Sequence, residues 1–198
     1  MAKYTMDTPN KLTILRIVMI PFFVFFFEMA SWQYSYLLAL LVFAAASFTD
    51  WLDGYLARKN NLVSDFGKFM DPLADKILVA AAMVCFVGRG MTTAPIVITV
   101  LAREFLVTSL RLIAANKGVV IAADRWGKYK TATTMVWICF GLFTMQAGAS
   151  GWGGDAVFVI MLSIYYLLMS LSLFFTVFSG FNYIWKNRSL LADVVTPK

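Results

Sequence analysis

The sequence predicts an all-α integral membrane protein with six transmembrane helices in a single domain that covers residues 1–198. The first indication is composition, because 61% of the 198 residues are hydrophobic and only 14% are charged. Soluble domains are usually about 45–50% apolar and about 25% charged, so one water-soluble core cannot bury this excess. The second indication is that the apolar residues gather in long segments. Together these observations exclude an ordinary soluble enzyme, a disordered tail and a disulfide scaffold.

Six apolar segments are the predicted spans, and several approach the ~20 residues that a helix needs to cross the hydrocarbon core. In chain order they are residues 12–27, 32–49, 73–87, 91–115, 132–149 and 156–183. The third is short, and the fourth is interrupted by Arg103, Glu104 and Arg111. A Gly-Arg-Gly turn at 88–90 ends the third span, and four glycines within 148–154 separate the last two.

The basic residues orient the predicted spans. If the spans alternate, sixteen of the 17 Lys and Arg residues lie on the side of the N-terminus, and only Arg89 lies on the other. Because positive loops stay inside, this asymmetry places both termini in the cytoplasm and predicts a multi-pass protein of the cell membrane. The same face would attract the anionic headgroups of the bilayer. The chain has no histidine, which excludes His-based acid–base catalysis and His-containing metal sites.

Four aspartates lie near the cytoplasmic ends of the second and third spans. Asp50 and Asp53 are three residues apart and Asp71 and Asp75 are four apart, so each pair lies on one helix face. The connection between the two spans is short, so the pairs converge. Crowded carboxylates need cations, and oxygen ligands suit Mg²⁺ or Mn²⁺ first, with two ions as the arrangement used for in-line phosphoryl displacement. The alternative is a set of interfacial charges paired with nearby Lys or Arg.

Three small residues, Gly54, Ala57 and Gly67, adjoin these acids at helical spacing. Without bulky side chains, a flat or charged ligand can approach the backbone beside the metals. Close packing between helices is the alternative reason for small residues in a membrane protein. Arg58 lies at the rim, where a guanidinium can meet a phosphate or a lipid headgroup. Asp65 lies off the spacing and is expected to be a solvated loop residue or a helix-start charge.

The full pattern resembles the signature of the CDP-alcohol phosphatidyltransferase family at every fixed position: Asp50-x2-Asp53-Gly54-x2-Ala57-Arg58-x8-Gly67-x3-Asp71-x3-Asp75. Members of that family use a divalent metal to displace CMP from a CDP-linked lipid with an alcohol acceptor. The resemblance implies that Asp50, Asp53 and Asp71 hold the ions, with Asp75 at the metal site and acting as general base. It also implies that the three small residues line the cytidine-diphosphate pocket and that the protein forms a homodimer.

The acceptor is indicated by charges in and after the fourth span. Arg103, Glu104 and Arg111 lie in an apolar helix, where ionisable groups usually mark a functional site. Glu104 and Arg111 are seven residues apart, nearly on one face, and are expected to partner each other. With Lys128 and Lys130 added, the cations exceed what a neutral alcohol needs, and a phosphate on the acceptor explains them. Positive-inside anchoring is the alternative.

These stretches, and the opening residues 8–16, resemble the members that use sn-glycerol 3-phosphate. In the family, the opening forms an amphipathic juxtamembrane segment before the first span and helps to close the nucleotide site. The resemblance therefore implies that Asn10, Thr13 and Arg16 lie near the CDP moiety. Asn10 can equally be a helix N-cap, and Thr13 a helix-start residue.

The sequence thus predicts a Mg²⁺-dependent enzyme that transfers the phosphatidyl group of CDP-diacylglycerol to glycerol 3-phosphate, at a site facing the cytoplasm. One alternative keeps this chemistry with another acceptor, either phosphatidylglycerol (cardiolipin synthesis) or inositol phosphate. A different class is a small cation transporter with the acids as its ion site. Against the transporter, the acids lie at one membrane face rather than at its middle. No nucleic acid is expected as a partner.

Overall fold

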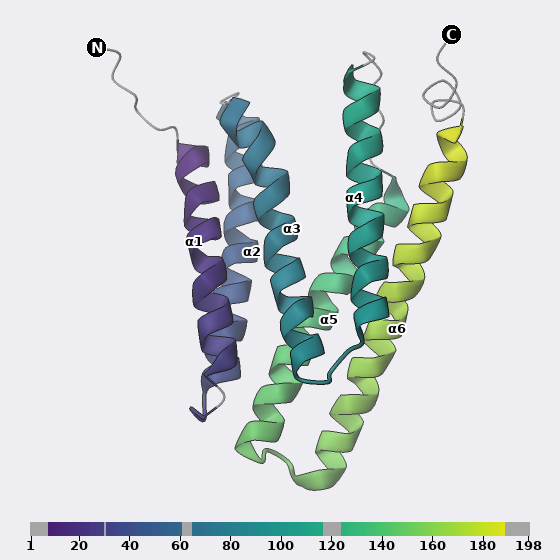
Figure 1. Cartoon of the computed structure of the whole chain (residues 1–198). Helices are drawn as coiled ribbons and strands as arrows, with labels where there is room; N and C mark the ends of the chain where they lie inside the picture. Colours follow the sequence, from purple (N-terminus) through teal and green to yellow (C-terminus); the bar gives the residue numbers. More distant parts are fainter. Residues whose placement is uncertain (1–7, 30, 61–64, 117–123, 189–198) are drawn as a thin grey trace.

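The computed structural model describes residues 8–29, 31–60, 65–116 and 124–188, with side chains described in these ranges except at 8–12, 50–60, 65–72, 75 and 116. This part of the chain forms six α-helices (Figure 1). They are α1 (Thr8–Glu28), α2 (Ser35–Asn60), α3 (Asp65–Gly88), α4 (Ala94–Asn116), α5 (Arg125–Ser150) and α6 (Gly154–Lys186). The predicted all-α fold with six helices is therefore confirmed.

Each of the six predicted segments forms a helix, apart from residues 32–34 and 91–93 at the starts of two of them, and several helices extend well beyond the segments. α2 continues past the apolar stretch to Asn60, and α3 begins at Asp65, well before residue 73. Hydropathy marks the part of a helix that meets lipid, whereas the polar turns beyond it continue the same backbone hydrogen bonding. Asp65 is thus a helix-start residue, one of the two roles expected for it, and Pro72 lies inside α3 rather than at its start.

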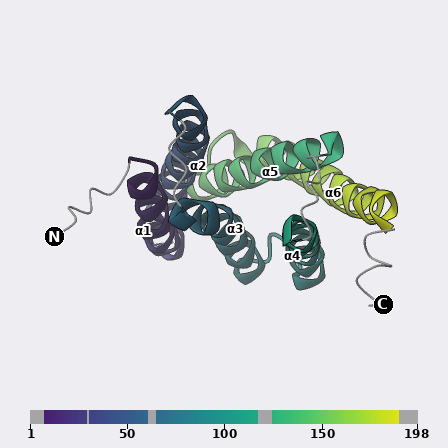
Figure 2. The same ribbon diagram turned by 90° about the horizontal axis from the view of Figure 1, so that it is seen from above.

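The helices alternate in direction, so α1, α3 and α5 begin at the end of the bundle where α2, α4 and α6 finish (top of Figure 1). Arg89 lies at the opposite end, where its Nη2 is 3.1 Å from the Glu28 carboxylate. From above, α1, α2 and α3 group together, and α4 stands apart (Figure 2). α4 packs mainly on α6 and less on α3. This arrangement matches the division of charges between the two ends that the sequence predicts.

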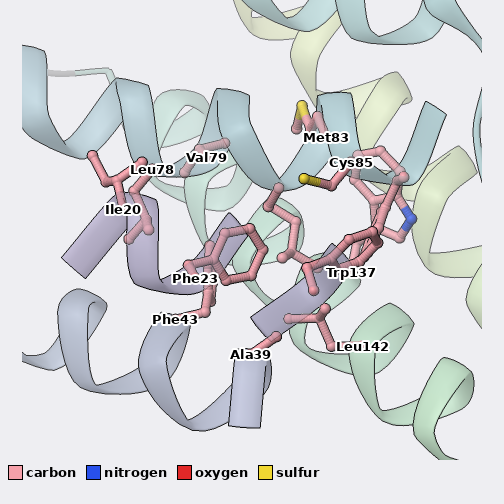
Figure 3. Packing of buried hydrophobic residues seen from close by; sticks show 14 of the residues in the cluster. Ile20, Phe23, Ala39, Phe43, Leu78, Val79, Met83, Cys85, Trp137 and Leu142 are labelled. Carbon is pink, nitrogen blue, oxygen red and sulfur yellow. The ribbon is translucent and has the colours of Figure 1, made fainter. Parts of the chain in front are cut away.

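Within the core, which also holds aliphatic side chains, aromatic rings join α1, α2, α3 and α5 (Figure 3). Phe23 and Phe43 lie with their ring centroids 5.9 Å apart, and Phe27 and Phe86 with theirs 6.1 Å apart. Trp137 continues the chain of contacts 6.2 Å from Phe86. All five side chains are fully buried. Such tilted and edge-to-face pairs add stability beyond the area that they bury.

The surface exposes many large apolar side chains, unlike that of a soluble protein, and polar side chains are buried among the apolar ones inside. Leu167 is 67% exposed and Phe181 is 64% exposed, while Gln146 is completely buried. Inside, the Thr134 hydroxyl oxygen lies 2.8 Å from that of Ser172, the kind of bond that joins helices in lipid. By length and composition, α5 and α6 are long and apolar enough to cross a membrane.

The start of the chain differs from the expected juxtamembrane segment. In the described part, α1 runs without interruption from Thr8 to Glu28, and residues 1–7 lie outside the described residues. The reason is a single inward stripe at helical spacing, in which the fully buried Thr13 and Arg16 are followed by Ile20, Phe23 and Phe27. Because the polar and apolar parts share one stripe, they pack as one helix.

Candidate functional site

The four aspartates lie on two neighbouring helices at the end of the bundle where α2 finishes. Asp50 and Asp53 belong to α2, and Asp71 and Asp75 belong to α3. The helical backbone keeps each pair on one face, as the spacing predicts. The side chains of these four lie outside the described residues, so their coordination of a metal stays a prediction. The same holds for Asn10, Gly54, Ala57, Arg58 and Gly67.

Two of the predicted nucleotide-binding residues are described, Thr13 and Arg16. Both are completely buried, on the face of α1 that turns into the bundle. α1 packs on both α2 and α3, the helices that carry the aspartates. Arg16 thus lies on the side of α1 that packs into the bundle, and its role beside a diphosphate remains a prediction.

An open groove lies at the same end of the bundle, between α3, α4 and α5. Its volume is about 840 Å³, and its walls include Arg103, Arg111 and Lys128, three of the four predicted acceptor-binding cations. Lys76 from α3 also lines it. Lys130 instead borders a small neighbouring cavity of about 30 Å³. The structure thus brings together cations that are up to 52 positions apart in the sequence, from Lys76 to Lys128.

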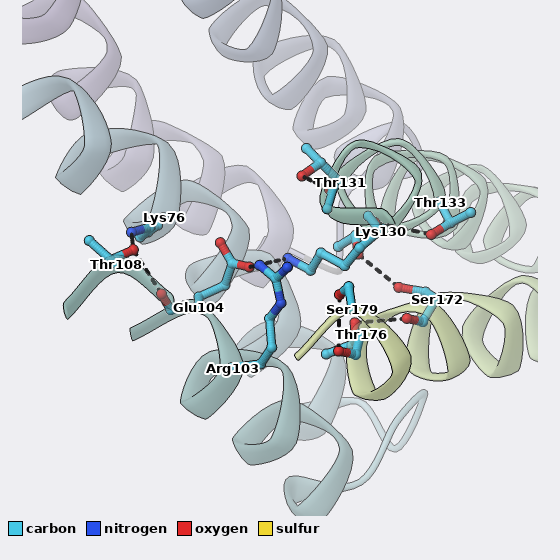
Figure 4. Close-up of polar contacts among 12 residues, drawn as sticks. Lys76, Arg103, Glu104, Thr108, Lys130, Thr131, Thr133, Ser172, Thr176 and Ser179 are labelled. Atoms are coloured by element: carbon cyan, nitrogen blue, oxygen red, sulfur yellow. Dashed lines mark hydrogen bonds and ion pairs between the residues drawn. The ribbon is translucent and has the colours of Figure 1, made fainter. Parts of the chain in front are cut away.

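Glu104 is the centre of a buried ion cluster that we call the Glu104 cluster, formed with Arg103 and Lys130 (Figure 4). Its Oε1 atom lies 2.8 Å from Arg103 Nη1 and 2.9 Å from Lys130 Nζ. The side chains of Lys130 and Arg103 are only 4% and 13% exposed. The carboxylate therefore holds one cation from its own helix and one from α5.

The expected pairing of Glu104 with Arg111 is wrong. Seven residues bring two side chains to nearly the same face of a helix, but also separate them by roughly 10 Å along its axis. A glutamate does not cover that distance when Arg103 and Lys130 are within reach. The Arg111 guanidinium instead lies over the ring of Tyr183 in α6, with its carbon 5.6 Å from the ring centroid.

The groove keeps a surplus of positive charge. Within the described residues, neither Arg111 nor Lys128 has a carboxylate partner, and both are exposed. Asp124 also lines the groove, but Asn182 donates a hydrogen bond to it, and Lys186 Nζ is 3.5 Å from its Oδ1. With both acids of the groove engaged, the available cations suit a doubly charged anion such as a phosphate.

Sequence reasoning missed several residues of this site. Lys76 donates a hydrogen bond to the Thr108 hydroxyl, which in turn donates to the Glu104 carbonyl oxygen over 2.8 Å. Lys76 could have been suspected, because it follows Asp75 directly. Asp124 and Tyr183 gave no signal, since their partners lie 58 or more residues away along the chain.

Residues 6–181 match the CDP-alcohol phosphatidyltransferase family, and the chain belongs to this family of membrane proteins. A Bacillus subtilis relative, a CDP-diacylglycerol–glycerol-3-phosphate 3-phosphatidyltransferase, is 38% identical over 93% of this chain and 97% of its own. Proteins of the same name from Escherichia coli and Rickettsia typhi are 37% and 36% identical. These matches cover 84% and 89% of this chain and 93% and 94% of theirs. The predicted family is thus confirmed.

Proposed function

We propose that the protein transfers the phosphatidyl group of CDP-diacylglycerol to sn-glycerol 3-phosphate, releasing CMP and forming phosphatidylglycerol phosphate. The observation that carries this proposal is the groove, where Arg103, Arg111 and Lys128 converge with no carboxylate to neutralise the latter two in the described residues. An acceptor with a phosphate matches this surplus, whereas a neutral or zwitterionic alcohol does not. The names of the three relatives agree with that acceptor.

The proposed reaction takes place at the cytoplasmic face of the cell membrane. In this proposal all six helices span the bilayer, both termini lie in the cytoplasm, and residues 1–198 form one domain that assembles as a homodimer. The alternation of the helices supports this topology, because it gathers the basic residues at one end and leaves Arg89 at the other. A cytosolic phosphorylated acceptor then reaches the groove directly.

The signature aspartates, which are Asp50, Asp53, Asp71 and Asp75, are proposed to hold a pair of Mg²⁺ or Mn²⁺ ions. Four carboxylates with no histidine in the chain form the all-oxygen donor set that these ions prefer. The chemistry supplied by such ions is neutralisation of diphosphate charge. Gly54, Ala57 and Gly67 would line the cytidine-diphosphate pocket, with Arg58, Asn10, Thr13 and Arg16 around it.

In the proposed mechanism, Asp75 accepts the proton of the C1 hydroxyl of glycerol 3-phosphate. The hydroxyl oxygen forms a bond to the phosphorus that carries the diacylglycerol, and the bond from this phosphorus to the CMP oxygen breaks. Positioning and charge stabilisation supply most of the rate in such displacements. Arg111 and Lys128 would bind the acceptor phosphate directly, with Arg103 beside them. Lys130, which is buried against Glu104, would act by fixing that carboxylate.

Steady-state kinetics of single variants test the acceptor assignment. Arg111→Ala and Lys128→Ala should each raise the KM for glycerol 3-phosphate about tenfold or more, because a charge-assisted contact contributes about 1.5–3 kcal/mol. The KM for CDP-diacylglycerol should change little. Arg188→Ala is the matched control, since Arg188 lies over Trp185, which is not part of the groove. Unchanged KM values in both groove variants, or equal reaction with plain glycerol, would refute the assignment.

A further inference from the structure

Helix α6 lies behind the acceptor groove and contacts two of its arginines without lining it. Gly180 and Tyr183 are three residues apart and therefore share one face of α6. Gly180 adjoins Arg103, and Tyr183 adjoins Arg111. We propose that Gly180 and Tyr183 are positioning residues, which act on the acceptor phosphate through these two arginines. This inference rests on the proposed function.

Tyr183 holds Arg111 in a way that leaves its donors available. The Tyr183 side chain is 2% exposed and fixed in the bundle, and the Arg111 guanidinium carbon lies 5.6 Å from the ring centroid. A ring face attracts a cation through its quadrupole but accepts no strong hydrogen bond. A carboxylate at this place would compete with the substrate for the N–H groups. The ring thus restricts the arginine while its N–H donors stay free for a phosphate.

The ring of Tyr183, and not its hydroxyl, makes this contact. The hydroxyl oxygen is buried and has no hydrogen-bond partner in the structure as described. Replacing tyrosine by phenylalanine therefore removes a polar atom that gains nothing from its surroundings. A leucine, by contrast, fills part of the space but removes the quadrupole. The two substitutions separate the role of the ring from that of the volume.

Gly180 provides the space that Arg103 needs. A Cβ atom at Gly180 would lie 3.1 Å from Arg103 Cγ, which is tighter than most real contacts. Arg103 cannot move aside freely, because its Nη1 is bound to Glu104 at 2.8 Å. On the other side, a Cβ atom added to Gly127 in α5 would lie 3.4 Å from Arg103 Nη2. The arginine thus passes between a glycine of α6 and a glycine of α5, so any side chain at 180 displaces it.

The test compares Tyr183→Leu with Tyr183→Phe in the full-length protein. Tyr183→Leu should raise the KM for glycerol 3-phosphate roughly two- to fivefold, the change expected for the loss of one partly exposed cation–π contact. Its KM for CDP-diacylglycerol should stay constant, and Tyr183→Phe should behave as the unaltered protein. Trp185→Leu is the matched control, because it removes a contact of the same kind, to Arg188 at 4.9 Å, away from the groove.

A double variant tests whether Tyr183 acts through Arg111. Once Arg111→Ala is present, adding Tyr183→Leu should raise the KM no further, whereas independent effects would multiply. Gly180→Ala should raise the same KM, while Gly88→Ala, whose Cβ meets no atom within 4 Å, should not. Gly180→Ala keeps the inference testable if Tyr183→Leu fails to fold.

The outcomes separate this inference from the proposed function. If Arg111→Ala raises the KM for glycerol 3-phosphate but Tyr183→Leu and Gly180→Ala leave it unchanged, the positioning roles are refuted and the acceptor site stands. If Arg111→Ala leaves that KM unchanged, the positioning role of Tyr183 is refuted; if Lys128→Ala leaves it unchanged as well, the acceptor site itself is refuted. Equal effects of Tyr183→Leu and Tyr183→Phe would also refute the role of the ring.

Discussion

Removing the charge of Glu104 should destabilise the protein strongly. Glu104→Gln keeps the size of the side chain but leaves Lys130, whose side chain is 4% exposed, without its carboxylate. Removing one partner of a buried ion pair costs about 3–5 kcal/mol, because the other charge stays buried and unpaired. The Glu104 side chain is 20% exposed, so water relieves part of this cost. We therefore expect the free energy of unfolding to fall by ~3 kcal/mol, at the lower end of this range.

Thermal unfolding in detergent measures this effect, followed by the fluorescence of the six tryptophans. For a chain of this size, ~3 kcal/mol corresponds to a decrease in Tm of roughly 6–12 °C. Glu28→Gln is the matched control, because it breaks an exposed ion pair with Arg89. The Glu28 side chain is 58% exposed and the Arg89 side chain is 31% exposed. Exposed pairs contribute about 0–1 kcal/mol, so its Tm should fall by at most about 4 °C.

A second substitution checks the physical cause. Adding Lys130→Met to Glu104→Gln removes the unpaired ammonium, and replacing a buried ion pair by apolar residues is often nearly neutral. The double variant should therefore regain most of the lost Tm. The reasoning is refuted if Glu104→Gln lowers the Tm no more than Glu28→Gln does. It is also refuted if the double variant is less stable than Glu104→Gln alone.

Three further predictions concern the rest of the molecule. Changing any one signature aspartate to asparagine should abolish most of the enzyme's turnover while the protein still inserts into the membrane, whereas Asp65→Asn should reduce turnover only slightly. Near-normal turnover in two of the four variants would contradict the two-metal site. In a cysteine-free background, Lys59→Cys should be labelled only from the cytoplasm and Trp152→Cys only from outside, and the reverse pattern would overturn the orientation. Gln146→Ala should lower the Tm without changing either KM. The buried Gln146 side chain accepts a 2.9 Å hydrogen bond from the backbone N–H of Leu37 near the start of α2, and the variant loses this bond.

The helices could be predicted from the sequence because lipid imposes a strong constraint on length and polarity. A bilayer needs ~20 apolar residues per crossing, and this requirement appears directly as hydropathy. The same requirement says nothing about where a helix ends outside the lipid. The spacing of the aspartates and small residues predicts helix on both sides of the connection, but not that α2 ends at Asn60 and α3 begins at Asp65.

Three cations of the acceptor groove, Arg103, Arg111 and Lys128, could be predicted, but not the pairing of charges within the groove. Arg103 and Arg111 can be identified from the sequence, because charged residues in an apolar segment are rare and energetically costly. The partner of Glu104 depends on which face of α5 packs toward α4, which no local pattern encodes. Tyr183 is an aromatic residue in a span rich in aromatic residues, so its role emerges only from its place beneath Arg111.

The contact between Lys76 and Thr108 links the two halves of the proposed site. Lys76 follows Asp75 in α3, and Thr108 lies in α4 between the two arginines of the groove. The helix that carries the proposed base is therefore bonded to the helix that carries the acceptor-binding cations. In the proposed reaction, helix packing rather than a mobile loop then sets the distance from the base to the acceptor phosphate. A site of fixed length selects acceptors by the separation of hydroxyl and phosphate, which favours a short phosphorylated alcohol over a bulky one.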